Sequence, residues 1–277
     1  MLGTFYQHDQ AASQLEAIST ERLNTGYLVN PIAQYDKSIS ETRFTTTSSN
    51  SVGGVAWRIT TNDGGNASAE EVVFTIHGII LQCDLPPIIR PFGKSTSPKH
   101  LQQRILLTGL GTPTFNQALD GLVRLDSLLR LNLRDTPKEL AQNIGGHPTL
   151  GITNRYFTSK RMANEEEHIG FNDSIDPKGI LEAFRGDTLV HTTENKVFYY
   201  RKQTHLSGDG LFSKTQPANI KNGDIVEVQF TATLIESKNR KISTKTNCIT
   251  KLVLRSITLL DDTFSEVPIS LAYNNNY

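Results

Sequence analysis

Short segments in which apolar and polar residues alternate dominate this sequence, and few segments show helical spacing. Residues 54–60 (GVAWRIT) and 71–81 (EVVFTIHGIIL) each have the composition of a β-strand, and the Asn-Asp-Gly turn signal between them predicts a hairpin. The same pattern predicts further strands, in chain order, at 26–32, 43–47, 103–110, 188–191, 197–202, 224–235 and 247–260. Both faces of the last strand are partly apolar, which indicates that it is covered on both sides along part of its length.

The clearest helical pattern covers residues 113–131, where apolar residues recur every three or four positions behind the helix-start signal Thr112-Pro113. Two acid–arginine pairs along it are spaced for i,i+4 ion pairs: Asp120–Arg124 and Asp126–Arg130. A second, shorter helix is predicted from 137 to the glycines at 145–146.

These elements predict an α+β fold that is mainly β, with twisted antiparallel sheets arranged as a barrel or a sandwich and one amphipathic helix near 113–131. A long strand, a basic hairpin loop and another long strand also occur in OB-fold barrels, so an OB-like barrel is one option for the C-terminal region. The expected organisation is an N-terminal α+β region (1–165), a basic β-rich region (166–262) and a disordered tail (263–277), with a single domain as the alternative.

Charge is distributed unevenly along the chain, although the formal net charge is zero. Residues 196–255 contain eleven Lys and Arg against four Asp and Glu, which gives +7 and leaves −7 for the remainder. Such an asymmetry bears on partners and steering rather than on the fold.

Cysteine content and the N-terminal sequence bear on location. There are two cysteines, far apart, which favours a reducing compartment over a disulfide scaffold. The first twenty residues lack the basic and apolar regions of a signal peptide, and no apolar run is long enough to span a membrane. We therefore expect an intracellular protein, nuclear or cytoplasmic, that is not inserted in a membrane.

The strongest candidate site combines aromatic and basic residues within 196–255. Flat rings can stack on bases and cations can bind phosphates, which is the mixture that single-stranded nucleic acid needs. The predicted contact residues lie on a strand and on the hairpin loop that follows later: Tyr199, Tyr200, Arg201, Lys202, Lys238, Arg240, Lys241 and Lys245. The alternative is that one tyrosine packs in the core while the charges keep an edge strand soluble.

Other constellations predict less. His77 and Cys83 lie close in sequence and His191 lies near a turn, but none comes with the partners of a catalytic pair or a zinc site, so no catalytic residue, metal or cofactor is predicted. Gly109-x-Gly111 precedes a helix without the Lys-Ser/Thr ending of a phosphate loop. Arg255 interrupts an apolar strand and is expected to pair with Glu227 or Asp224.

Five ordered motifs in the C-terminal third resemble those of a known group of proteins. They are Ile175-Asp-Pro-Lys-Gly-Ile-Leu181, Leu189-Val-His-Thr-Thr-Glu-Asn195, Tyr199-Tyr200, Asn222-Gly-Asp-Ile-Val-Glu-Val228 and Leu252-Val-Leu-Arg-Ser-Ile-Thr-Leu-Leu-Asp261. The set resembles uncharacterised proteins abundant in mushroom-forming fungi, where many copies suggest spread with mobile elements. The resemblance implies a genomic setting and no established activity.

The sequence therefore favours a non-enzymatic binding protein whose basic C-terminal strands contact single-stranded nucleic acid. The alternative is a protein-interaction or self-assembly module, in which the acidic remainder of one copy meets the basic segment of another.

Overall fold

The computed structural model describes residues 6–38, 44–51, 54–61, 70–93, 95–133, 138–163, 168–203, 211–236 and 248–265. Within them the helices are α1 (His8–Thr25), α2 (Tyr35–Ser38), α3 (Pro113–Arg130) and α4 (Ile180–Arg185). The strands are β1 (Phe44–Ser51), β2 (Gly54–Thr61), β3 (Phe74–Asp84), β4 (Gln102–Thr108), β5 (Ala141–Ile144), β6 (His147–Arg155), β7 (Thr158–Ser159), β8 (Leu189–Val190), β9 (Phe198–Gln203), β10 (Leu211–Lys214), β11 (Ile225–Glu236) and β12 (Cys248–Asp261). The fold is thus mainly β with few helices, as predicted.

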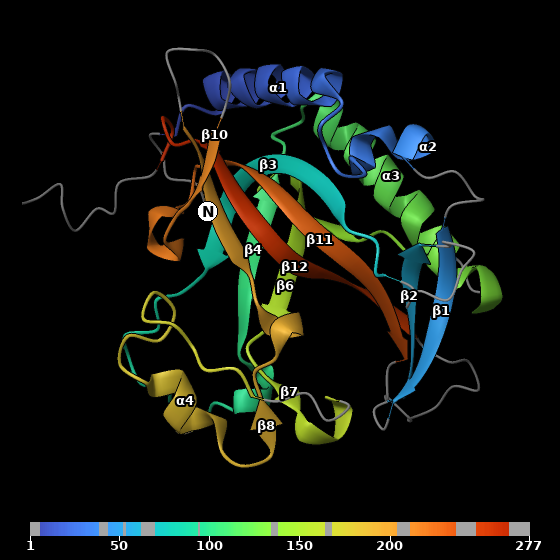
Figure 1. Ribbon diagram of the computed structural model, residues 1–277. Helices are drawn as coiled ribbons and strands as arrows, with labels where there is room; N and C mark the ends of the chain where they lie inside the picture. The colour runs from blue at the N-terminus through green and yellow to red at the C-terminus, as the bar shows by residue number, and fades with distance from the viewer. Residues whose placement is uncertain are drawn as a thin grey trace, which may run out of the picture.

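Five of these strands close into a barrel (Figure 1). β3 pairs with β4, β4 with β6, β6 with β12, β12 with β11, and β11 again with β3. All pairings are antiparallel except that between β6 and β12. This is the five-stranded barrel architecture of the OB fold. The OB-like barrel that the sequence offered for the C-terminal region is present, and it also includes earlier strands, because three barrel strands precede residue 165 and two follow it. The predicted division at 165/166 therefore runs through one folded unit.

Two short extensions, together with β5, which pairs with β6, widen the barrel into a ten-stranded sheet. β2 pairs with the end of β11, and β1 pairs with β2. At the other end, β9 runs parallel to the last part of β12, and β10 pairs with β9. Figure 1 shows β10 beside the arrowhead of β12 and the β1–β2 pair near its opposite end. The sheet is therefore mixed, with two parallel pairings that the sequence did not predict.

The barrel interior is apolar and draws on every barrel strand. Phe74, Leu107, Ile152, Val228 and Leu254 are all fully buried in one cluster. Burial of side chains of this size contributes roughly 1.5–3 kcal/mol each, which makes the interior the main source of stability.

α1 and α3 cover different parts of this barrel. α1 places Leu15 and Ile18 on Ile79 and Ile225, which point outward from β3 and β11. α3 adds its apolar face to the main core and contacts β2, β3 and β11. A Cβ at Gly121 would lie 2.2 Å from the carbonyl oxygen of Ile32, so glycine there permits the chain after α1 to cross α3 closely.

α3 confirms the predicted helix but only one of its two ion pairs. Asp126 and Arg130 pair at 2.8 Å, and both are fully buried. Arg124 instead pairs with Asp36 of α2. None of the described helices has the length and apolar character of a membrane span.

Three local predictions are wrong. The residues predicted as a strand at 26–32 form only an isolated bridge at Pro31 followed by a 3-10 turn. The predicted hairpin between 54–60 and 71–81 is absent, because β2 pairs with β1 and β11 and touches the second segment only at the Thr60–Glu71 bridge. The described part of the short helix predicted after 137 is the strand β5, which forms a hairpin with β6 across two glycines at positive φ. Of the predicted tail (263–277), residues 263–265 are described, with Phe264 packed against the cluster beneath α1, and 266–277 lie outside the described residues.

Candidate nucleic-acid interface

Neighbouring residues of β9 point to opposite faces of the sheet, and this divides the predicted site. Tyr199 is the tyrosine that packs in the core, with 6 % of its surface exposed. Its hydroxyl donates a hydrogen bond to the side-chain oxygen of Gln103, and burial raises its pKa well above the ordinary value. A ring held in this way cannot stack on a base, so the predicted role of Tyr199 is wrong and the core alternative applies to it.

Arg201 points to the same face of β9 as Tyr199, beyond the edge of the core. Its Nη2 lies 2.8 Å from Oδ2 of Asp262, and both side chains are nearly half exposed. An exposed pair of this kind contributes little to stability. Its effect here is to offset the charge that Arg201 would offer to a phosphate.

Tyr200 and Lys202 point to the other face, where β10 supplies matching residues. The register places Lys214 opposite Tyr200 and Phe212 opposite Lys202. The amide of Thr215 donates a hydrogen bond to the carbonyl of Tyr199, so Thr215 and Tyr199 form a hydrogen-bonded pair. Hydrogen-bonded and non-hydrogen-bonded pairs alternate along an antiparallel ladder, so the two pairs named above are both non-hydrogen-bonded. Side chains in such pairs are closest together, with Cα atoms about 4.5 Å apart. Each rung therefore joins one aromatic ring and one ammonium group.

Phe198 extends this pattern by one step along β9. Phe198 and Phe212 are 51 % and 46 % exposed, which is unusual for phenylalanine. Lys202 and Lys214 form no hydrogen bond or ion pair with another described residue. We call the five residues of this surface the β9–β10 face: Phe198, Tyr200, Lys202, Phe212 and Lys214.

Only two members of this face, Tyr200 and Lys202, are among the contact residues predicted from the sequence. Period-two alternation groups Phe198 with these two, and separates all three from Tyr199 and Arg201. That signal was present in the sequence and would have identified Phe198. The contribution of β10 required the strand register, which the pattern alone does not supply.

Arg22 from the C-terminal part of α1 adds a cation beside the face. Its guanidinium carbon lies 5.2 Å from the centre of the Phe212 ring, within the range of a cation–π contact. The same group donates from Nε to Oε2 of Glu227 at 2.6 Å, and Nε2 of His77 lies 3.1 Å from that oxygen. Burial alone would raise the pKa of Glu227, but the hydrogen bond with His77 and the charge of Arg22 together hold it below its ordinary value. The ionised carboxylate thus fixes Arg22 over Phe212.

The other half of the predicted site, Lys238, Arg240, Lys241 and Lys245, lies outside the described residues. Its two attachment points are described: β11 ends at Glu236, and β12 begins at Cys248. β9 begins to pair with β12 at Ser256, eight residues further on. At a rise of about 3.3 Å per residue, these eight residues extend about 26 Å along β12. The loop therefore joins the barrel at the opposite end of β12 from β9, and the prediction that strand and loop are close neighbours stays a prediction.

The residues considered for enzymatic chemistry do not converge in the described structure. His77 points outward from β3, whereas the thiol of Cys83 contacts Asn222 and the carbonyl of Ile220. Burial, with the charges of Asp224 and Asp84, raises the pKa of Cys83 to about 11, so the thiol stays protonated at neutral pH. His191 is buried with Nδ1 2.8 Å from the carbonyl of Tyr156. The described residues hold no group of three or more His, Cys, Asp or Glu placed to bind a metal ion.

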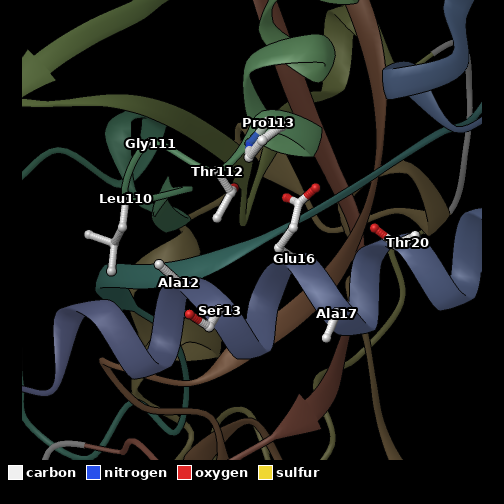
Figure 2. Close-up of a pocket in the computed structure, with 9 residues that line it drawn as sticks. All are labelled: Ala12, Ser13, Glu16, Ala17, Thr20, Leu110, Gly111, Thr112 and Pro113. Carbon is white, nitrogen blue, oxygen red and sulfur yellow. The ribbon is translucent and has the colours of Figure 1, made fainter.

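An open groove of about 570 Å³ lies between α1 and the start of α3 (Figure 2). Glu16 of α1 points toward the first turn of α3, and its Oε2 accepts hydrogen bonds from the amide of Thr114 at 3.1 Å and from the Thr114 hydroxyl at 2.7 Å. The helix start after Gly109-x-Gly111 therefore carries a carboxylate of the chain itself, which opposes the binding of an external anion there.

No protein-family model and no curated protein matches the sequence. The resemblance of the C-terminal motifs to fungal proteins therefore stays a prediction. Among solved structures, the chain is similar to the crystal structure of gp2.5, a single-stranded DNA-binding protein encoded by bacteriophage T7. The match has 14 % sequence identity and a TM-score of 0.33, and covers 74 % of this chain and 97 % of the other.

Proposed function

We propose that this protein is a non-enzymatic binding protein that holds single-stranded nucleic acid on the β9–β10 face. The observation that supports this most directly is the pair of rungs, Tyr200 with Lys214 and Lys202 with Phe212. Pairing between two strands brings together there two partly exposed rings and two lysines that have no partner among the described residues. A phenylalanine that served only to stabilise the fold would be expected to be buried, whereas Phe198 and Phe212 are half exposed.

The physical chemistry of the face fits a single strand better than a duplex. Stacking of a base on an aromatic ring is worth about 1–3 kcal/mol and is available only when the base is not already stacked in a helix. The lysines lie within one side-chain length of the rings, so a backbone that follows the stacked bases meets positive charge at each rung. Stacking and phosphate contacts of this kind are largely independent of sequence.

A titration of a fluorescein-labelled thymidine dodecanucleotide, followed by fluorescence anisotropy, tests this proposal. We expect micromolar or tighter binding at about 50 mM salt, with weaker binding at about 200 mM because counterions are released. A duplex of the same length should compete less well. Absence of binding at the lower salt concentration would rule the proposal out.

The charge asymmetry, which favoured self-assembly, is partly neutralised within one chain. Arg255 and Arg201 belong to the basic segment, and their partners Glu71, Glu194 and Asp262 belong to the acidic remainder. These intramolecular pairs leave less charge for contact between copies. Light scattering at low and high salt, without nucleic acid, would detect self-association that depends on the charge that is left.

A further inference from the structure

Three arginines from three different strands meet on the outer surface of the barrel. They are Arg58 on β2, Arg155 on β6 and Arg255 on β12. β6 and β12 lie side by side where Thr153 pairs with Val253, two residues before Arg155 and Arg255. The side chain of Arg255 spans this surface, because its Nη2 lies 2.6 Å from Glu71 and 2.8 Å from Glu194.

Among the described residues, the carboxylates in this arginine cluster are fewer than its cations. Glu71 and Glu194 are both engaged by Arg255, in place of the predicted partners Glu227 or Asp224. Nη1 of Arg58 lies 4.0 Å from Oε2 of Glu71, which is beyond hydrogen-bond distance. Within the described part of the chain, three guanidinium groups therefore share two carboxylates.

Two of the arginines have guanidinium groups that the described chain does not satisfy. Nε of Arg58 is buried without a hydrogen-bond partner in the described part of the chain, as is Oε1 of Glu71. Arg155 is exposed, and no described residue forms a hydrogen bond or an ion pair with its guanidinium. A buried donor without a partner is destabilising, and an anion that accepts a hydrogen bond from it is one ordinary way to satisfy it.

The charges around Arg155 also favour the binding of an anion. Partial burial and the nearby charge of Arg58 lower the pKa of Arg155, with Glu194 as the opposing influence. Two guanidinium groups that repel each other gain most from an anion placed between them, and arginine binds phosphate through two parallel hydrogen bonds.

The cluster continues the β9–β10 face along β12. Ser256, the residue after Arg255, pairs with Phe198 at the start of the face. A strand stacked on Phe198 would therefore pass directly to Arg255 and its neighbours. The cluster also lies between the face and the end of β12 where the basic loop joins.

We propose that Arg58, Arg155 and Arg255 form a phosphate-binding site that takes the backbone of a nucleic-acid strand where it leaves the β9–β10 face. The site rests on the proposed function for its ligand. Arg58 and Arg155 bind the phosphodiester, while Arg255, held by two carboxylates, positions the edge of the site.

The test compares the double variant Arg58→Gln/Arg155→Gln with the wild type on two labelled thymidine oligonucleotides. A tetranucleotide can occupy the face alone, whereas a dodecanucleotide can reach the cluster. We expect the variant to bind the dodecanucleotide about ten-fold more weakly, with a salt slope smaller by about 0.7 for each phosphate that is no longer bound. Its affinity for the tetranucleotide should be unchanged.

Arg124→Gln is the matched control, because it removes an exposed arginine on α3. An equal decrease in affinity in this control, equal decreases at both lengths, or an unchanged affinity for the dodecanucleotide would overturn the proposed site. Melting temperature supplies a second readout. Removal of two repelling cations should leave it unchanged or raise it, whereas arginines with a structural role would lower it.

Failure of the two proposals can be separated. If the wild type binds both oligonucleotides and the double variant matches it, the phosphate site fails and the proposed function stands. If the wild type binds neither, the proposed function fails, and calorimetric titration with pyrophosphate decides the site. Saturable binding of pyrophosphate that Arg155→Gln abolishes would then show that the site binds a free phosphate compound. Absence of such binding would overturn the proposed site.

Discussion

Lys202 and Phe212 lie directly opposite each other on β9 and β10, in a pair whose side chains are as close as an antiparallel sheet allows. The ring is half exposed, and Arg22 lies against it as a second cation. A half-exposed hydrophobic ring that lies opposite Lys202 and under the guanidinium of Arg22 is poorly explained by packing. A base stacked on that ring, with its phosphate near Lys202, would use every one of these contacts.

The first prediction concerns the exposed rings. Phe212→Ala should weaken binding of a thymidine dodecanucleotide on the order of ten-fold, because one base can no longer stack, an interaction worth about 1–3 kcal/mol. Phe198→Ala should have a similar effect. Leu211→Ala is the control, since Leu211 is the neighbouring residue of β10, is 59 % exposed and points to the other face. Anisotropy titrations of the three variants would refute the stacking role if the leucine variant were weakened as much as the phenylalanine variants.

The second prediction separates two adjacent cations. Lys202→Gln should reduce the slope of log K against log salt by about 0.7, the value for one phosphate contact on a single strand. Arg201→Gln should leave the slope unchanged, because Arg201 is paired with Asp262 on the opposite face. Titrations across a salt series measure both slopes, and a larger change for Arg201 would contradict the assignment of faces.

A third prediction tests the link between α1 and the face. Glu227→Gln removes the carboxylate that Arg22 and His77 share, and should lower the free energy of unfolding by about 1–3 kcal/mol because both partners are left partly buried. It should also weaken oligonucleotide binding, since Arg22 is no longer fixed over Phe212. Urea denaturation measures the first effect, with Arg124→Gln as an exposed ion-pair control that should not change stability. A variant as stable as the wild type would argue against a structural role for the carboxylate.

The fourth prediction is a pH dependence of stability at Asp224. Burial raises the pKa of this carboxyl to about 6, against hydrogen bonds from Ser265 and from the amide of Lys221 that favour the ionised form. Between the unfolded value of about 4 and the folded value, the folded state binds more protons, so stability falls as pH rises through this window. The decrease should total about 2–3 kcal/mol and persist above pH 6. In Asp224→Asn it should be absent. Urea denaturation across this pH range measures both proteins, and identical pH profiles would show that the carboxyl is not shifted.

Local sequence patterns were enough to predict much of the secondary structure. The strands β2, β3, β4, β9, β11 and β12 and the helix α3 lie close to their predicted ranges. Each has an apolar pattern of the right period and clear ending signals, so local information decides it. The β5 region resembles a helix end because glycine, which closes its hairpin, is also the usual residue after a helix.

Partner choice between strands was not predictable in the same way. The turn signal after β2 is strong, yet β2 pairs with β11, more than 170 residues later in the chain. The interior of the barrel decides this pairing, since Ile59 and Leu234 bury their side chains in one core. The sequence carries that information only as the sum of many apolar contacts.

In β12, one extra residue changes which side chains point into the core. Strict alternation along the strand would place Val253, Ile257 and Leu259 on a single face. In the structure Gln229 pairs with Ser256 and Phe230 with Leu254, so Arg255 is an extra residue in a β-bulge. Leu254 and Ile257 consequently both point into the core, although strict alternation would place residues three apart on opposite faces. The same bulge turns Arg255 outward, where it reaches Glu71 and Glu194.

The candidate site was half predictable, because part of it depends on local alternation and part on how strands pair. Composition identified β9, and alternation along β9 separates Tyr200 and Lys202 from Tyr199 and Arg201. The register with β10, which completes the face, and the distance to the loop at 237–247 depend on how the barrel closes. No local pattern encodes either.

Photocrosslinking with mass-spectrometric mapping tests the central claim most directly. A thymidine oligonucleotide with 5-iodouracil at successive positions reacts with aromatic side chains in contact with the base. Crosslinks at Phe198, Tyr200 or Phe212 that disappear in high salt would support single-strand binding on the β9–β10 face. Efficient crosslinks that map only to other aromatic residues, such as Tyr27 or Tyr35, would contradict it.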